Sequence, residues 1–307
     1  MFTKADHLLA EFAAAHHSVF TNEHAREFGL THAQIDHRVL NSWTHLYDGV
    51  YRSAGASPTW KGSLVAACWA AHPPCAISHR SAAQLYELPG GQTDPVELTC
   101  GRWLRARSPG LVVHESTRID ESDIELVDGI PVMRPERVVL ELAGLRPYPR
   151  YVETVIQAAR RKRLITYEST LAVFNRHARR GLRGVTALRA ALEQWDPSQR
   201  ATESNMETLL LQVLRDGGHT NAIPQFEIKD DRGFFVARVD IALPEWLIAV
   251  EYDSKQEHSD EFQLARDARR RNRIVAAGWR LLSARHGDLK SGGPELLDAI
   301  DSTRRSA

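Results

Sequence analysis

The sequence predicts a multi-domain α/β protein, on the basis of its length, the order of its patterns and one polar junction. At 307 residues the chain has room for two or three domains, each with a core of its own. Residues 1–55 are patterned as short helices closed by a hairpin, whereas residues 196–307 alternate helical and β-rich segments. The polar stretch DPSQRATES, residues 196–204, is typical of a linker. We therefore expect domains at 1–55, 56–195 and 196–307.

Composition indicates neither a nucleic-acid partner nor a membrane. The chain carries 39 Lys+Arg and 39 Asp+Glu, so any basic surface must be local. No apolar run is long enough to cross a bilayer, and the N-terminus lacks a signal-peptide pattern. Three scattered cysteines, Cys68, Cys75 and Cys100, indicate neither a disulfide framework nor a zinc site. We expect a cytoplasmic protein without membrane partners.

Residues 5–53 predict a small helical unit with a β-hairpin. ADHLLAEFAAAHH is an amphipathic helix, and a second helix begins at Thr21 or Asn22 and ends at Phe28–Gly29. Thr31 is an N-cap for a third helix, HAQIDHRVLNS. A glycine between two short helices is typical of a helix-turn-helix, and the Asp-Gly pair in THLYDGVYRS predicts the hairpin.

The third helix of this unit, residues 32–40, is the candidate DNA reader. In a helix-turn-helix such a helix enters the major groove, with Gln34, His37 and Arg38 here as its exposed polar residues. Units of this kind are also used for protein contacts, and that alternative stays open.

Residues 60–145 predict an α+β domain. Its elements are a helix from Ser81, strands at 96–99 and 111–114, a hairpin turn at Asp128–Gly129 and a helix after Pro135. A helical stretch then runs to about Trp195 and contains the basic turn RRKRL, which we expect on a solvated face. His79, Arg80 and His114 have no partner at metal-ligand or triad spacing, so the sequence favours structural roles for them.

The segment RVDIALPEWLIAVEYD, residues 238–253, predicts a β-hairpin that gathers carboxylates. Antiparallel pairing places Asp240 beside Glu251, and Asp253, two residues further on, points to the same side as Glu251. Clustered carboxylates repel one another, and a hard cation such as Mg²⁺ relieves the repulsion. The alternative is a set of ordinary strand-end acids on a solvated rim.

Helices flank this hairpin. Ser204 is an N-cap with Glu207 three residues later, so Glu207 either completes a capping box or faces the carboxylates. The helix DEFQLARDARRRNRIVAAG follows, with apolar points at Phe262, Ala265, Ile274 and Val275, and WRLLSA predicts another strand. Its arginines beside an acidic hairpin indicate phosphate contacts, with Arg266, Arg270 and Arg271 as candidates. Arg270 also has Asp267 one turn earlier, which favours a structural ion pair.

Residues 204–300 resemble the restriction-endonuclease-like PD-(D/E)XK fold, and most closely bacterial domains related to very-short-patch-repair endonucleases. The matching residues are, in order, Glu207; Arg238, Val239 and Asp240; Glu251, Tyr252, Asp253 and Ser254 with His258; Asp267, Arg270 and Asn272; and Gly278 with Trp279. Ser254 stands where these domains have Gly. Asp253 stands where the wider superfamily has Lys, a departure that the close relatives share.

The N-terminal half resembles AbiEi antitoxins of abortive-infection systems. Residues 5–53 are similar to the winged helix-turn-helix that opens those proteins. The segments AISHRSAAQLYELPG, PVELTC, LVVHES and DGIPVMRPERVVLELA are similar to their second part.

The nuclease resemblance implies an α/β sandwich that hydrolyses DNA phosphodiesters with Mg²⁺ or Mn²⁺, in DNA repair or phage defence. It implies that Asp240, Glu251 and Asp253 hold the metal, that Glu207 assists and that His258 moves a proton. The antitoxin resemblance implies a second function, a non-enzymatic regulator or antitoxin with a toxin or other protein partner. An acidic metal cage has no purpose in such a platform, which favours the nuclease.

Overall fold

The computed structural model describes residues 3–53, 55–105, 108–253 and 261–305, and of residues 261–264 the backbone alone. Within these ranges the chain is a mixed α/β protein with three sheets, which confirms the predicted fold class at this level. None of the helices in the described ranges is both long and apolar enough to span a membrane.

The chain divides into two compact units. One contains Met1–Arg146 with Ala172–Val185, and the other contains Pro147–Leu171 with Thr186–Ala307. The first unit carries two of the sheets and the second carries the third.

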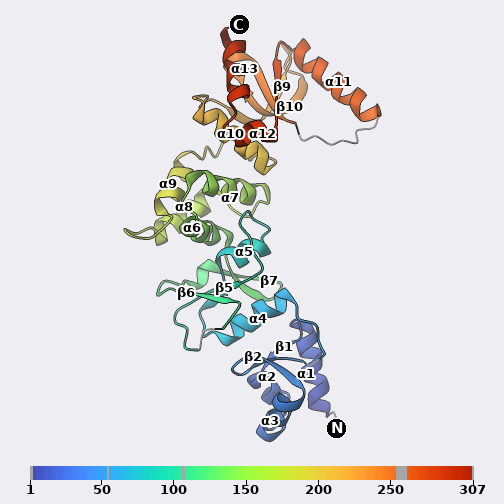
Figure 1. Ribbon diagram of the computed structural model, residues 1–307, viewed down its shortest axis with the longest axis vertical. Helices are drawn as coiled ribbons and strands as arrows, with labels where there is room; N and C mark the ends of the chain where they lie inside the picture. The colour runs from blue at the N-terminus through green and yellow to red at the C-terminus, as the bar shows by residue number, and fades with distance from the viewer. Residues whose placement is uncertain (1–2, 54, 106–107, 254–260, 306–307) are drawn as a thin grey trace. The chain divides into compact units, whose positions relative to one another are not determined.

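The first unit opens with three helices and a three-stranded antiparallel sheet in the order β1-β3-β2 (Figure 1). The three helices and the β2–β3 hairpin were predicted, whereas β1 was not. Its elements are α1 (Lys4–Ala15), β1 (Val19–Thr21), α2 (Asn22–Glu27), α3 (His32–Asn41), β2 (Trp43–Tyr47) and β3 (Val50–Ser53). Thr3, Thr21 and Thr31 each accept a backbone hydrogen bond in a capping box, which is why the three helices begin where they do.

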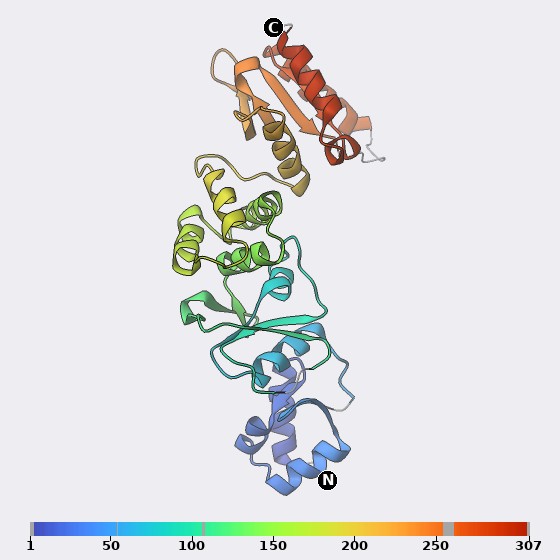
Figure 2. The ribbon, with the colours of Figure 1, turned by 60° about the vertical axis from the view of Figure 1, so that its left-hand side comes forward.

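A five-stranded sheet in the order β6-β5-β4-β8-β7 follows in the same unit, in the cyan and green part of the chain in Figure 2. Its elements are α4 (Trp60–Ala70), β4 (Cys75–Ile77), α5 (His79–Leu85), β5 (Val96–Cys100), β6 (Leu111–Glu115), a 3-10 turn (Glu121–Asp123), β7 (Ile124–Val127), β8 (Ile130–Met133) and α6 (Pro135–Leu145). The predicted hairpin is confirmed, since Asp128 and Gly129 both have positive φ between β7 and β8. The cysteines are free and buried.

Helix α5 begins two residues earlier than predicted. Its N-cap is Ser78, and the Ser81 hydroxyl accepts a hydrogen bond from the backbone N–H of Glu97 at 2.9 Å. Ser81 therefore ties the helix to strand β5 and does not cap it.

The predicted helical stretch consists of α7 (Pro149–Arg161), α8 (Tyr167–His177) and α9 (Val185–Glu193). The expectation that its basic turn lies on a solvated face is wrong for two arginines. Arg160 donates to the carbonyl of Gln199 at 2.6 Å, and Arg161 donates to the carbonyl of Thr202 at 3.2 Å. These arginines satisfy backbone carbonyls of the 196–204 segment, because that segment has no secondary structure to do so.

The second unit is built on a four-stranded sheet in the order β12-β11-β10-β9. Its elements are α10 (Asn205–Asp216), β9 (Ile223–Lys229), β10 (Phe235–Leu243), a 3-10 turn (Pro244–Trp246), β11 (Ile248–Tyr252), α11 (Glu261–Ala276), β12 (Arg280–Ala284), α12 (His286–Lys290) and α13 (Pro294–Arg305). The predicted hairpin is confirmed as β10 and β11, which are antiparallel, and the predicted last strand, β12, is parallel to β11.

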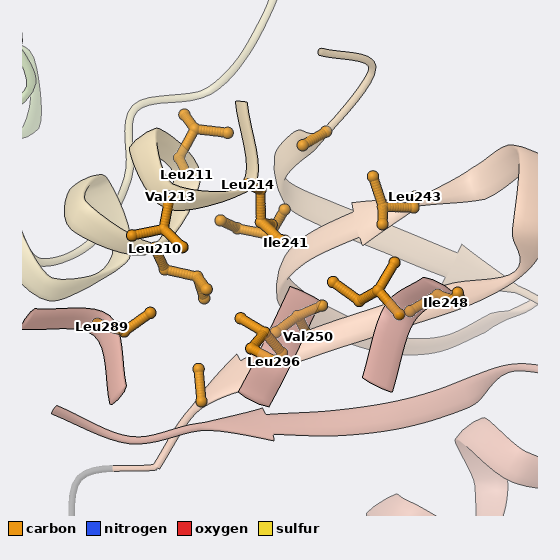
Figure 3. Packing of buried hydrophobic residues seen from close by; sticks show 13 residues of the cluster. Leu210, Leu211, Val213, Leu214, Ile241, Leu243, Ile248, Val250, Leu289 and Leu296 are labelled. Carbon is orange, nitrogen blue, oxygen red and sulfur yellow. The ribbon is translucent and has the colours of Figure 1, made fainter. Parts of the chain in front are cut away.

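Alternating strand residues build a core on each face of this sheet. Ile241 and Val250 pack with leucines of α10 and with residues of α12 and α13, as Figure 3 shows. On the other face Ala242 and Ala249 share a cluster with Ile274 of α11. The alternation is the period of two expected for a sheet covered on both sides.

Helix α11 buries less than predicted. Ile274 is fully buried, but Ala265 and Val275 are exposed, and the side chain of Phe262 lies outside the described residues. Instead, arginines attach this helix to the sheet: Arg273 donates to the carbonyl of Phe235 at 3.0 Å, and Arg270 to that of Arg238 at 2.6 Å.

The division into units differs from the predicted boundary at residue 196. Helix α7 packs on α10, where Gln212 donates to Glu153 at 3.0 Å and Arg215 pairs with Glu153 at 2.5 Å. Thr202, inside the expected linker, is buried and is held by Arg161. The polar composition of the linker therefore reflects hydrogen bonding to α7, which only the tertiary structure reveals.

Two glycines of the first unit provide a stability test. Gly184 has φ +86°, and a Cβ there would lie 2.4 Å from the carbonyl carbon of Ala143 in α6. Gly181 has φ +85° but open space around its Cβ position. We expect Gly181→Ala to cost about 1 kcal/mol through backbone strain, and Gly184→Ala to cost roughly 2–4 kcal/mol because overpacking adds to that strain. Urea unfolding of both variants measures the difference. Equal losses would show that α6 moves freely away from Gly184.

Candidate active site

The pairing of β10 with β11 sets the positions of two candidate carboxylates. Ile241 lies opposite Val250 in the antiparallel register, so Asp240 and Glu251 occupy the next opposed positions. The sequence therefore predicted their juxtaposition correctly. Both side chains are half-buried at this end of the hairpin.

Asp240 is held in an environment that disfavours its negative charge. Its Oδ2 accepts a hydrogen bond from the backbone N–H of Tyr252 at 2.9 Å. Burial, together with the negative charges of Glu207 and Glu251, nevertheless raises the pKa of Asp240 to about 6. The hydrogen bond and the positive charge of Arg270 oppose this shift without cancelling it. Burial is the largest cause of the shift, and the two neighbouring carboxylates add to it.

Glu251 has a cation beside it already. Arg270 of α11 donates to its Oε1, and this hydrogen bond is the largest cause of the raised pKa of Arg270. The sequence predicted an ion pair between Arg270 and Asp267, but the main partner of Arg270 is Glu251. Of the neighbouring carboxylates, Asp267 contributes least to the raised pKa of Arg270. Arg270 reaches across to the sheet because Glu251 and the Arg238 carbonyl both lie within its range.

Glu207 lies in the first turn of α10 and is buried. Ser204 caps the helix as predicted, accepting from the Glu207 backbone N–H at 3.0 Å. The Glu207 side chain does not return to Ser204, because its Oε2 accepts from the N–H of Glu203 and the amide of Gln225, each at 2.7 Å. Its charge reaches Asp240, so Glu207 both stabilises the helix start and belongs to the acidic site. Gln225, at a positive φ in β9, was not anticipated from the sequence.

Asp253 follows β11 and is exposed, and its backbone N–H donates to the carbonyl of Ala284 at 2.9 Å. Among the described residues, Asp240, Glu251 and Asp253 do not bring three ligand atoms within 4.8 Å of one another. His258 lies outside the described residues. The buried part of the candidate site is therefore Asp240 and Glu251, with Glu207 behind them.

A pocket of about 350 Å³ opens between β10 and α11 beside these carboxylates. Its lining includes Phe235, Val236, Ala237 and Asp267. It also includes four arginines, Arg238, Arg266, Arg270 and Arg273. Arg266 and Arg270 were predicted to contact DNA, whereas Arg271 is exposed and is not among the lining residues. Arg273 belongs to the arginine run that the sequence assigned to phosphate contacts, whereas Arg238, two residues before Asp240, was not singled out as a DNA contact.

The candidate DNA-reading residues of α3 are less free than predicted. Arg38 keeps only 13% of its side chain exposed, because its guanidinium binds both oxygens of Asp6 at 2.6 and 2.8 Å. This pairing raises the pKa of Arg38 and lowers that of Asp6. The Gln34 side chain accepts from the Thr31 N–H in the capping box, so His37 and the outer surface of α3 remain exposed. The expectation of an exposed Arg38 is wrong.

The structure also gathers residues that the sequence assigned to separate structural roles. One ligand atom each of His79, Glu97 and His114 lies within 4.8 Å of the other two. The two histidines are 35 positions apart, and Glu97 stands in a β-rich segment, so their spacing gave no signal of a shared site.

Comparison with known proteins gives relatives but no family. No family model matches the chain. It is 27% identical over 256 residues to the uncharacterized proteins Rv2248 and MT2308 of Mycobacterium tuberculosis, strains ATCC 25618 / H37Rv and CDC 1551 / Oshkosh respectively. Each alignment covers 82% of this chain and 89% of the relative. The similarity therefore includes residues of both units.

Proposed function

We propose that this protein is a metal-dependent DNA endonuclease or nickase. The observation that carries the proposal is the gathering of three carboxylates, Asp240, Glu251 and Glu207, next to a pocket lined by arginines, one of which, Arg270, binds Glu251. A carboxylate pair suits a hard divalent cation, and adjacent arginines suit a phosphodiester. The two requirements of metal-assisted phosphodiester hydrolysis thus meet at one end of one sheet.

The donor set fits Mg²⁺ or Mn²⁺. Asp240 and Glu251 are oxygen donors on opposed strand positions, and Arg270 pairs with Glu251 alone among the two. Asp240 and Glu251 would hold the ion, with Asp253 as a further ligand reached from the strand end. When bound, the ion supplies a water of lowered pKa and charge neutralisation at the scissile phosphate.

The chain's own residues would supply substrate binding. Arg238, Arg266 and Arg273 line the pocket beside the carboxylates, and they and the exposed Arg271 of the same helix as Arg266 and Arg273 would contact phosphate oxygens. Residues 1–55 would act as a winged helix that presents α3 to DNA, in line with the resemblance of this segment to AbiEi-type proteins. Helix α10 followed by β9, β10 and β11 would be the core of a PD-(D/E)XK domain, serving DNA repair or phage defence.

One observation favours a second candidate, a DNA-binding regulator or antitoxin without catalysis. Arg270 already neutralises Glu251, and an ion pair of this kind can replace a metal in a domain kept as a platform. In that case a toxin or other protein would be the partner. Metal binding and cleavage separate the two functions directly.

The catalytic prediction compares Asp240→Asn and Glu251→Gln with Asp231→Asn, an exposed acid in the β9–β10 turn. With supercoiled plasmid and Mg²⁺ or Mn²⁺, the wild type should nick or linearise DNA, and EDTA should stop it. Each site variant should lose cleavage by roughly 100-fold or more, because each removes a ligand charge. The control should retain it.

Two further readouts complete that comparison. Calorimetry should show weaker Mg²⁺ binding by the two site variants, with DNA affinity largely kept. Wild-type cleavage rates in both variants would refute the site, and an inactive wild type that binds DNA would favour the regulator.

The pH prediction follows from the raised pKa of Asp240. Between pH about 4 and 6 the folded state retains a proton that the unfolded state has lost, so wild-type stability falls as pH rises through this window. Asp240→Asn has no such proton. In EDTA, the stability of the variant relative to the wild type should therefore rise by about 2 kcal/mol from pH 4 to pH 7. Urea unfolding at each pH measures this, and Mg²⁺ at pH 7 should restore the wild type alone. If the stability difference between Asp240→Asn and the wild type did not change with pH, the pKa of Asp240 would not be raised in the folded protein.

The DNA-binding prediction uses the arginines that make no contact with the carboxylates. Arg266→Gln with Arg271→Gln should weaken binding to DNA of any sequence. The plot of log affinity against log salt should become shallower by roughly two units, one for each lost phosphate contact. Lys290→Gln, an exposed cation on α12, should leave the slope unchanged. An unaltered slope in the double variant would place DNA elsewhere.

A further inference from the structure

A cluster of metal-type ligands lies in the first unit, far in the sequence from the acidic hairpin. His79 opens α5, Glu97 lies in β5 and His114 lies in β6. Strands β5 and β6 are parallel neighbours, and Thr99 pairs with His114 in their register. One donor atom from each of the three residues lies within 4.8 Å of the others.

Glu97 anchors this cluster. It is fully buried, and Arg80 binds its Oε1 at 2.5 Å through Nε and also donates its backbone N–H to Oε2 at 3.3 Å. Arg80 therefore compensates the buried charge, and this contact holds the carboxylate in one orientation. The Oε2 atom faces Nε2 of His114 at 3.4 Å.

Two buried polar atoms beside Glu97 are poorly satisfied. Oγ1 of Thr99 has no hydrogen-bond partner, and Nε2 of His114 has only Oε2 of Glu97, in a long contact of 3.4 Å. An unsatisfied buried polar atom is costly, so each such atom calls for a physical explanation such as a bound ion.

His79 is oriented in the way that metal-ligating histidines are. Its Nδ1 lies 2.9 Å from the Ser78 hydroxyl and 3.6 Å from Oε2 of Glu141, which leaves Nε2 for a ligand. The Glu141 carboxylate also accepts the His79 backbone N–H at 3.0 Å. A carboxylate behind an imidazole sets the tautomer and the ring orientation of a metal ligand. His79 has φ +50°, a strained value for a non-glycine residue that the surrounding contacts must maintain.

The cluster opens to solvent on one side. His79 and His114 line a pocket of about 440 Å³ whose walls also include Thr99, Ser116, Arg137 and Arg183. Three protein ligands with an open side are typical of a catalytic zinc site, in which water or substrate takes the fourth position. Arg137 is already paired with Glu141, but Arg179 and Arg183 also line the pocket and favour an anionic group in that position.

We propose that His79, Glu97 and His114 bind a single Zn²⁺ or similar first-row divalent ion, with the fourth position facing the pocket. Two imidazoles and one carboxylate suit this class of ion better than Mg²⁺, which prefers oxygen ligands alone. The site lies in a different unit from the acidic hairpin and does not depend on the nuclease proposal.

Ion binding requires one rearrangement. The two imidazole rings stack with centroids 3.6 Å apart and planes 13° from parallel. Imidazole lone pairs lie in the ring plane, so parallel rings cannot both point at one ion. His114 has 28% of its side chain exposed and lines the pocket, so it is the ring with room to turn. Binding should therefore break the stack.

The test is metal binding by the metal-stripped full-length protein. Zn²⁺ titrated against a chromogenic chelator should give one tight equivalent, and Co²⁺ should give the visible absorption of a four- or five-coordinate ion. His114→Ala should weaken this binding at least tenfold, and Glu141→Gln by about 10–100-fold through the outer shell. His72→Ala, an exposed histidine between α4 and β4, and Asp240→Asn should retain the equivalent.

No Zn²⁺ or Co²⁺ binding by the wild type, or an unchanged equivalent in both His114→Ala and Glu141→Gln, overturns the proposal. Loss in Asp240→Asn alone assigns the ion to the carboxylates and also overturns it. Circular dichroism checks folding. If His114→Ala does not fold, Glu141→Gln and His114→Gln carry the test, and a Zn²⁺-dependent rise in wild-type Tm that is absent from both variants supports the site.

Discussion

The antiparallel register of β10 on β11 is the constraint on which the acidic site depends. Ile241 and Val250 face one core, while Ala242 and Ala249 face the other. A slip of one residue would exchange these sets and place large side chains where alanines fit beneath α11. The packing on both faces therefore locks the register, and Asp240 must lie opposite Glu251 despite their repulsion. The apolar pattern of the strands determines where the charges meet.

The charge of Glu251 also helps to attach helix α11 to the sheet, through its ion pair with Arg270. Of the α11 side chains that the structure describes, residues 265–276, only Ile274 is buried, and Arg270 and Arg273 donate to carbonyls of β10. Arg270 serves both purposes, because it binds Glu251 as well as the strand. A divalent ion at Glu251 would compete with this arginine for the same oxygen. If the proposed ion binds there, its binding would therefore be coupled through Arg270 to the attachment of α11.

Local signals in the sequence were sufficient for most elements. Amphipathic periodicity located the first helix and the Thr31 cap located the third, Asp128–Gly129 located a hairpin, and antiparallel pairing placed Asp240 beside Glu251. The failures share a different cause, a partner distant in the sequence. Arg38 is 32 positions from Asp6, and Arg161 is 41 positions from Thr202, so neither pattern showed that the arginine would be engaged. Helix periodicity likewise predicted an apolar face at Ala265 and Val275 that the sheet does not cover.

The cluster of His79, Glu97 and His114 shows most clearly that sequence patterns do not reveal partners distant in the sequence. Its donor atoms also differ from those of the acidic site. Its ligands come from two strands and a helix start, brought together only by the sheet order β6-β5-β4. Imidazole binds borderline ions strongly, whereas the hairpin offers only oxygen donors, so the two proposed sites would select different ions. Zn²⁺ in excess would nevertheless compete for carboxylates as well, since its affinity for most ligands exceeds that of Mn²⁺. A free-metal concentration that fills the imidazoles and leaves the carboxylates to Mg²⁺ is therefore the condition under which the contributions of the two units can be measured separately.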